Sequence, residues 1–159
     1  MSIKVGDRIP AASFNVMSDT GPKAVTTDEF FKGRKVVLFS VPGAFTPTCS
    51  AKHLPGFVDH ADEILGRGVD QIACVAVNDV FVMHAWGKSA NASKISMLAD
   101  GNGEFAAAVG LELDASGFGM GKRSQRFALI AEDGVVTHLF VEGPGEFKVS
   151  SAEHVLTAL

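Results

Sequence analysis

The chain has 159 residues, of which 47% are hydrophobic and 20% charged, so it is long enough to bury one core and too apolar for a disordered segment. Its net charge of −4, with no basic block, excludes the electrostatic surface that nucleic acids and anionic membranes require, and small molecules and proteins are the expected partners. No stretch approaches the ~20 apolar residues of a membrane span and the first residues do not resemble a signal peptide, so we expect one cytoplasmic domain over residues 1–159.

The first half of the chain predicts a strand, helix and strand unit. A small strand is expected at 14–17, and Thr26-Thr27-Asp28-Glu29 has the capping-box spacing of a short helix that ends near Gly33. Residues 35–41 and 71–77 are short apolar runs rich in β-branched residues, as in strands buried on both faces of a sheet. Between them, apolar residues recur at helical spacing: Leu54, Phe57, Val58, Ala61, Ile64 and Leu65. Two parallel strands joined by a helix make the predicted fold class α/β.

The second half of the chain predicts helices and one antiparallel hairpin. An Asp-Gly pair between two apolar runs is a strong signal for a two-residue hairpin turn, and Asp133-Gly134 is such a pair. The expected elements are helices at 80–88 and 103–109, hairpin strands at 126–131 and 135–141, and a terminal helix at 153–159. This order predicts a thioredoxin-like arrangement with a central mixed β-sheet flanked by helices.

Two cysteines occur, Cys49 and Cys74, which are too few for a disulfide scaffold and lack the spacing of a zinc or dithiol site. Cys49 follows the predicted strand at 35–41, at the end of a parallel sheet where ligands bind. It would lie in the first turn of the next helix, where unpaired N–H groups and the helix dipole stabilise an anion. A thiolate there is a nucleophile; the alternative is an ordinary buried thiol.

The pattern P-x-x-x-T-x-x-C is met in full by Pro42, Thr46 and Cys49, and the run from Gly43 to Phe57 resembles the signature of the type II/type 5 peroxiredoxins. The resemblance extends to three further segments: 77–82, 113–119 and 123–128. It implies a thioredoxin-like fold, hydroperoxide reductase activity and no bound cofactor or metal.

The resemblance also implies roles for individual residues. Cys49 would be the nucleophile, Thr46 would give its hydroxyl to the peroxide and the thiolate, and Pro42 would shield the sulfur from water. Arg126 would complete the site, because a guanidinium stays protonated and presents a rigid fork of donors to both sulfur and peroxide. Arg123 competes for this role, but only Arg126 directly precedes an aromatic residue, Phe127, as the arginine of the family does.

Other residues near the motif have weaker signals. Gly43 is assigned to the substrate pocket, and Phe45 and Phe118 either wall that pocket or belong to the core. His53 lies four residues after Cys49 on the same predicted helix, which suggests a Cys-His dyad or half a metal site. No third group is identifiable from spacing, so a histidine on the helix surface is the favoured interpretation.

Attack on a peroxide leaves a sulfenic acid that another thiol must reduce. The stretch 142–151 carries no cysteine, which excludes the resolving cysteine of animal-type relatives. Cys74 lies in a predicted buried strand, where we favour core packing over a resolving role, although the second remains open. The expected reductant is therefore external, either glutathione with glutaredoxin or thioredoxin.

A disulfide oxidoreductase and a redox sensor or chaperone are the two alternative functions, and a homodimer is the expected assembly. A disulfide oxidoreductase would need C-x-x-C where this chain has Thr46 and Cys49, and a redox sensor or chaperone would use the same thiol without turnover. A homodimer is expected from the resemblance and from the apolar residues around Phe45, Phe81 and Trp86.

Overall fold

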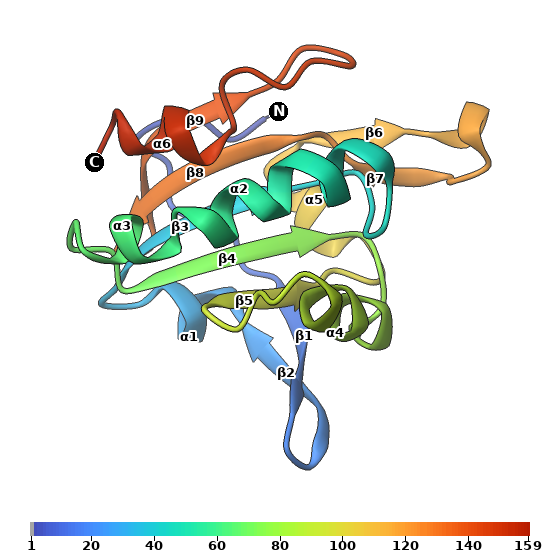
Figure 1. Cartoon of the computed structure of the whole chain (residues 1–159), viewed down its shortest axis with the longest axis horizontal. Helices are drawn as coiled ribbons and strands as arrows, with labels where there is room; N and C mark the ends of the chain where they lie inside the picture. The colour runs from blue at the N-terminus through green and yellow to red at the C-terminus, as the bar shows by residue number, and fades with distance from the viewer. Residues whose placement is uncertain (1) are drawn as a thin grey trace.

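A seven-stranded mixed β-sheet runs through the computed structural model, which describes residues 2–159 (Figure 1). Its strand order is β2-β1-β5-β4-β3-β8-β9. The strands are β1 (Ser13–Ser18), β2 (Gly21–Thr26), β3 (Lys35–Ser40), β4 (Gln71–Ala76), β5 (Ile95–Ala99), β8 (Phe127–Glu132) and β9 (Val135–Val141). The three strands β3, β4 and β5 are parallel, and the remaining pairs are antiparallel. The predicted mixed sheet of an α/β fold is thus confirmed.

Helices cover both faces of this sheet, and the alternation along β3 shows why. Val37 and Phe39 belong to one apolar cluster, while Val36 and Leu38 belong to the other, because successive side chains of a strand point to opposite faces. The first cluster packs under the π-helical segment η1 (Cys49–His53) and helices α2 (Leu54–Asp59), α3 (Ala61–Leu65), α4 (Val80–Ser89) and α6 (Ala152–Leu156). The second packs under α1 (Thr27–Phe31) and α5 (Glu104–Val109).

Several elements match the expectations from sequence. The capping box of α1 is present, with Thr26 accepting from Glu29 N–H and the Glu29 side chain accepting from Thr26 N–H. The Asp133-Gly134 turn joins β8 to β9, and both residues have the positive φ that a tight hairpin turn requires (50° and 79°).

Other elements differ from the expectations. The single helix expected between β3 and β4 is divided into η1, α2 and α3, with a break at His60. The terminal helix is shorter than expected and ends at Leu156. Strands β2 and β5 were not anticipated, because β2 is a largely exposed edge strand containing Pro22 and β5 is too short to show a period.

A second, two-stranded sheet is formed by β6 (Glu112–Asp114) and β7 (Lys122–Ser124), and it too was not anticipated. Figure 1 shows this hairpin projecting beyond the main sheet, with the short 3₁₀ segment η2 (Ser116–Phe118) in the connection at its tip. The described residues contain no helix long and apolar enough to cross a membrane.

Candidate active site

Cys49 lies where the chain turns from the end of β3 into the first helix on that face of the sheet. Pro47 and Thr48 are already helical, and Cys49 begins the π-helical segment, in which Leu54 N–H donates to the Cys49 carbonyl five residues earlier. A π-bulge is rare in proteins and frequently marks a functional site. The Cys49 side chain is fully buried, so its sulfur faces the interior of the molecule.

The loop between β3 and this helix is held in shape by polar contacts. Thr46 Oγ1 donates to the Gly43 carbonyl at 2.7 Å, and Ala44 N–H donates to Asn78 Oδ1 at 2.9 Å. Phe45 adopts a left-handed conformation with φ of 63°, which a non-glycine residue rarely takes. This loop therefore has a defined conformation next to the Cys49 thiol.

The structure separates the two candidate arginines. Arg126 Nη2 donates to Cys49 Sγ at 3.2 Å, and Arg126 Nη1 lies 2.8 Å from His53 Nδ1. Arg123 instead donates from Nη1 to the Val77 carbonyl and from Nε to the Met120 carbonyl, both at 2.9 Å. Arg126 is thus the arginine whose guanidinium contacts the sulfur. Arg123 instead links the backbone at Val77, just after β4, to the backbone at Met120, just before β7.

His53 is not a surface residue, which corrects the interpretation favoured from sequence. Its exposed fraction is 1%, and its Nε2 lies 2.9 Å from the Ser150 carbonyl. Burial, together with the positive charge of Arg126, lowers the pKa of His53 to about 3, so the imidazole is neutral at physiological pH. Because the Arg126 guanidinium bonds both Cys49 and His53, the arrangement is not the simple Cys-His dyad considered above.

The loop between β9 and α6 supplies residues that sequence reasoning missed. The Phe147 ring lies 5.8 Å from Arg126 Cζ and 4.9 Å from the His53 ring. The buried carboxylate of Glu142 accepts four hydrogen bonds from the same loop. The loop has no hydrophobic period and no cysteine, so no local signal in the sequence connects it with Cys49.

Burial differs widely among Pro42, which was expected to shield the sulfur, and the three residues assigned to the substrate pocket. Pro42 is half-buried and Gly43 is buried, and a Cβ on Gly43 would lie only 3.1 Å from Met120 Cε, so a larger residue would crowd the loop. Phe45 and Phe118 have exposed fractions of 55% and 86%, so the alternative that they are core residues is wrong. A role in walling the pocket stays a prediction for both.

Cys74 lies in the middle of β4, between Phe39 of β3 and Met97 of β5, and is fully buried. Burial raises the pKa of Cys74 well above its ordinary value, and the neighbouring Cys49 acts in the same direction. Both cysteines are free and belong to the same apolar cluster. Within residues 2–159 no group of three or more His, Cys, Asp or Glu side chains is arranged to hold a metal ion.

Known proteins are similar to this chain over nearly its whole length. A family model described as Redoxin matches residues 4–156. Chloroplastic peroxiredoxin-2E-2 of Oryza sativa subsp. japonica is 51% identical over 164 residues, covering 99% of this chain and 73% of the relative. Peroxiredoxin-2B of Arabidopsis thaliana is 48% identical over 159 residues, covering 99% of this chain and 98% of the relative.

Solved structures lead to the same family. The crystal structure of reduced Prx3 from Vibrio vulnificus in complex with H2O2 is 52% identical, covers 98% of each chain and has a TM-score of 0.96. These matches extend over nearly the whole chain and include its thioredoxin-like sheet and helices. The chain therefore belongs to the Redoxin family as a type II (Prx5-like) peroxiredoxin, a thiol-dependent peroxidase.

Proposed function

We propose that the protein reduces hydrogen peroxide and alkyl hydroperoxides through the thiolate of Cys49, in antioxidant defence and redox homeostasis. The observation that carries the proposal is the contact of 3.2 Å between Arg126 Nη2 and Cys49 Sγ. A guanidinium N–H on sulfur favours the thiolate over the thiol, because a hydrogen bond from a charged donor stabilises the anion.

The first step of the proposed reaction is nucleophilic. The sulfur attacks the terminal oxygen of the hydroperoxide, a sulfur–oxygen bond forms, and the oxygen–oxygen bond breaks. Cys49 keeps the terminal OH as a sulfenic acid, and the departing oxygen leaves as an alkoxide or hydroxide that takes up a proton from water. Arg126 and the Cys49 N–H are donors for the charge that develops on the departing oxygen, which lowers the barrier.

Thr46 and Pro42 shape the entrance to the sulfur in this proposal. The sequence predicted that Thr46 donates its hydroxyl to the peroxide and the thiolate, but its single hydroxyl hydrogen is directed at the Gly43 carbonyl. In this proposal the lone pairs of Thr46 Oγ1 therefore accept a hydrogen bond from the peroxide. Pro42 has no N–H to attract water, and its ring would shield the sulfur from water, as the resemblance implies. The role of Pro42 follows the family resemblance of the motif, whereas the role of Thr46 follows from the direction of its hydroxyl.

The second half of the cycle uses an external thiol. One thiol condenses with the Cys49 sulfenic acid to give a mixed disulfide and water, and a second thiol releases Cys49 and leaves as part of a disulfide. Glutathione with glutaredoxin, or thioredoxin, would supply these thiols. The full burial of Cys74 and its raised pKa support this assignment, because a protonated thiol inside a strand attacks poorly.

A turnover assay tests the function and the reductant together. Peroxide consumption is followed with excess glutathione and glutaredoxin, and in parallel with thioredoxin and its reductase. Many turnovers per protein with one of these systems are expected. Consumption of only one equivalent of peroxide with every reductant would indicate a redox sensor in place of an enzyme.

Replacement of Cys74 by alanine is expected to retain most of the thiol-supported peroxidase activity. The mutated residue fills no role in the proposed cycle, and wild-type protein oxidised with one equivalent of peroxide should carry a sulfenic acid or a glutathione adduct on Cys49. Mass spectrometry of the oxidised protein provides the check. A dominant disulfide between Cys49 and Cys74, together with lost turnover in Cys74→Ala, would make Cys74 the resolving thiol.

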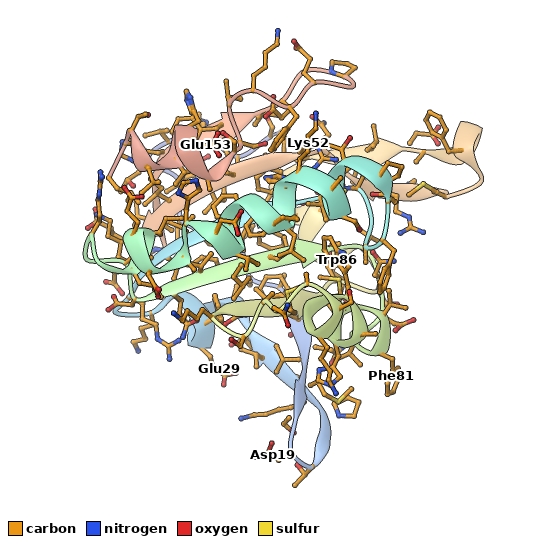
Figure 2. All side chains as sticks on the ribbon, viewed as in Figure 1. Asp19, Glu29, Lys52, Phe81, Trp86 and Glu153 are labelled. Carbon is orange, nitrogen blue, oxygen red and sulfur yellow. The ribbon has the colours of Figure 1, made fainter. Side chains whose placement is uncertain are left out.

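A homodimer is proposed from the exposed aromatic residues. Phe45, Phe81 and Phe118 have exposed fractions of 55%, 63% and 86%, and Figure 2 shows Phe81 on the outer side of α4. Large exposed aromatic side chains favour association with a partner surface. Sedimentation velocity at micromolar concentration should give a dimer, and Phe81→Asp should shift it toward monomer. A wild-type monomer at that concentration would contradict this prediction.

The cytoplasm is the proposed location. Two free, buried cysteines suit a reducing compartment. Fractionation of cells that express the protein, probed with an antibody, is the corresponding measurement.

A further inference from the structure

The loop between β9 and α6 is organised around one carboxylate oxygen. Glu142 Oε2 accepts from the backbone N–H groups of Lys148, Val149 and Ser150 at 2.8–2.9 Å and from Ser150 Oγ at 2.7 Å. Burial acts to raise the pKa of Glu142, but the hydrogen bonds from Ser150 and the backbone outweigh it, so this pKa lies below its ordinary value. The Glu142 carboxylate is therefore an anionic anchor: it holds residues 148–150, at the end of the loop, against Glu142 at its beginning.

This anchoring brings two parts of the loop to the active site. Ser150 donates its backbone N–H to Glu142, and the carbonyl of the same residue lies 2.9 Å from His53 Nε2. The Phe147 ring, one residue before the anchored Lys148 N–H, lies against the guanidinium of Arg126 and the ring of His53. Both contacts are thus made at, or one residue before, a group that donates to the Glu142 carboxylate.

The hydrogen bonds of His53 have a defined direction. A guanidinium only donates, so Arg126 Nη1 donates to His53 Nδ1, which must be unprotonated. The ring hydrogen is then on Nε2, which donates it to the Ser150 carbonyl. The imidazole thus transmits the position of the loop to the guanidinium through two hydrogen bonds at opposite sides of one rigid ring.

We propose that Glu142 is a positioning residue for the reaction, acting through the loop at 143–150 and through His53 and Phe147 on the Arg126 guanidinium. The Arg126 guanidinium contacts Cys49 and His53 by hydrogen bonds and lies against the ring of Phe147. Two of these groups are held by the Glu142 loop, and the third is the sulfur itself. The inference rests on the proposed roles of Cys49 and Arg126 and adds to them the group that holds Arg126 in place.

Glu142→Gln tests the proposal, because it removes the anionic anchor while it keeps the size of the side chain. The backbone bond from Glu142 N–H to the Arg126 carbonyl, 3.0 Å long, does not depend on the side chain and is retained. We expect the second-order rate constant for peroxide to fall about tenfold through misplacement of the guanidinium. We also expect iodoacetamide to alkylate Cys49 several-fold more slowly when rates are compared at the same pH, since the misplaced guanidinium no longer donates to the sulfur as well.

Glu146→Gln is the matched control, since it removes the same charge from the same loop. Glu146 is exposed and pairs with Lys148, and its side chain accepts none of the bonds that fold the loop. We expect both measurements on Glu146→Gln to match those of the wild type. A loss of equal size in the two variants would overturn the proposal in favour of a general effect of charge.

A double-mutant cycle separates positioning from plain stability. In the Arg126→Met background, Glu142→Gln should cause no further loss of rate, because the group that it positions is gone. Additive losses, or a Glu142→Gln protein with wild-type rates of peroxide reduction and of alkylation, would overturn the proposal. If Glu142→Gln fails to fold, Ser150→Ala removes one of the four donors and should give a smaller loss of the same kind, again absent in Arg126→Met.

The alkylation measurement needs no peroxide, so it also distinguishes the two proposals. A wild-type protein without turnover would contradict the proposed function, whereas the dependence of Cys49 alkylation on Glu142 would still be measurable. A wild-type protein with turnover and an alkylation rate insensitive to Glu142 would contradict only the positioning role.

Discussion

Replacement of Cys49 by serine is expected to abolish peroxide turnover and to leave the fold intact. Serine has nearly the size of cysteine, and the buried side chain ends at the Arg126 guanidinium, which can donate to a hydroxyl as it does to sulfur. A serine hydroxyl, however, is scarcely ionised at neutral pH, and a weak nucleophile does not attack the peroxide oxygen. The measurement is peroxide consumption with excess thiol, with circular dichroism to verify the fold.

Cys74→Ser is the matched control for this prediction. It makes the same chemical change at the other cysteine, which is equally buried but lies inside β4 and outside the motif of Pro42, Thr46 and Cys49. A buried hydroxyl costs about 1–3 kcal/mol of stability, so activity is compared at a temperature at which both proteins are folded. Turnover in a folded Cys49→Ser protein would remove Cys49 from the role of nucleophile.

Arg126→Met is expected to lower the second-order rate constant for peroxide by about 10²–10³, the usual scale for loss of one transition-state donor. Methionine retains much of the apolar stem of arginine but has no N–H to offer Cys49 Sγ or His53 Nδ1. Both the support of the thiolate and the donor for the departing oxygen are then lost. Stopped-flow measurement of peroxide reduction, under conditions where the first step limits the rate, gives this constant directly.

Arg123→Met provides the comparison. Arg123 donates to two backbone carbonyls and not to sulfur, so its loss should loosen the loop and reduce the rate far less than Arg126→Met. The reverse order of the two effects would mean that Arg123, and not Arg126, completes the site.

Several features were determined by the sequence itself, because they depend on neighbours along the chain. The apolar runs of β3 and β4 are buried on both faces of the sheet, as their composition predicted. The Asp133-Gly134 turn and the capping box of α1 also formed as expected, since each is closed by residues two or three positions apart. The motif of Pro42, Thr46 and Cys49 likewise spans one loop and one helix start, so its location beyond β3 was predictable.

The tertiary structure alone decided which groups meet Cys49. Arg123 and Arg126 are three residues apart, and only the pairing of β8 with β3 determines that Arg126 reaches the sulfur. His53 was expected on the helix surface because no third group was identifiable near it and Cys49, but the loop beyond β9 covers it. His53 is thus a buried, neutral acceptor for Arg126. Glu142 and Phe147 come from almost a hundred residues farther along the chain, as the 97-residue separation of His53 and Ser150 illustrates.

The physical reason is the range over which each interaction acts. Strand burial, turns and caps are set by periods and spacings of a few residues, which the sequence displays directly. A hydrogen bond between a guanidinium and a thiol depends on the order of strands in the sheet and on how a loop without a period folds over it. The sequence therefore determined where Cys49 lies, and the assembled sheet and the Glu142 loop decided which groups surround it.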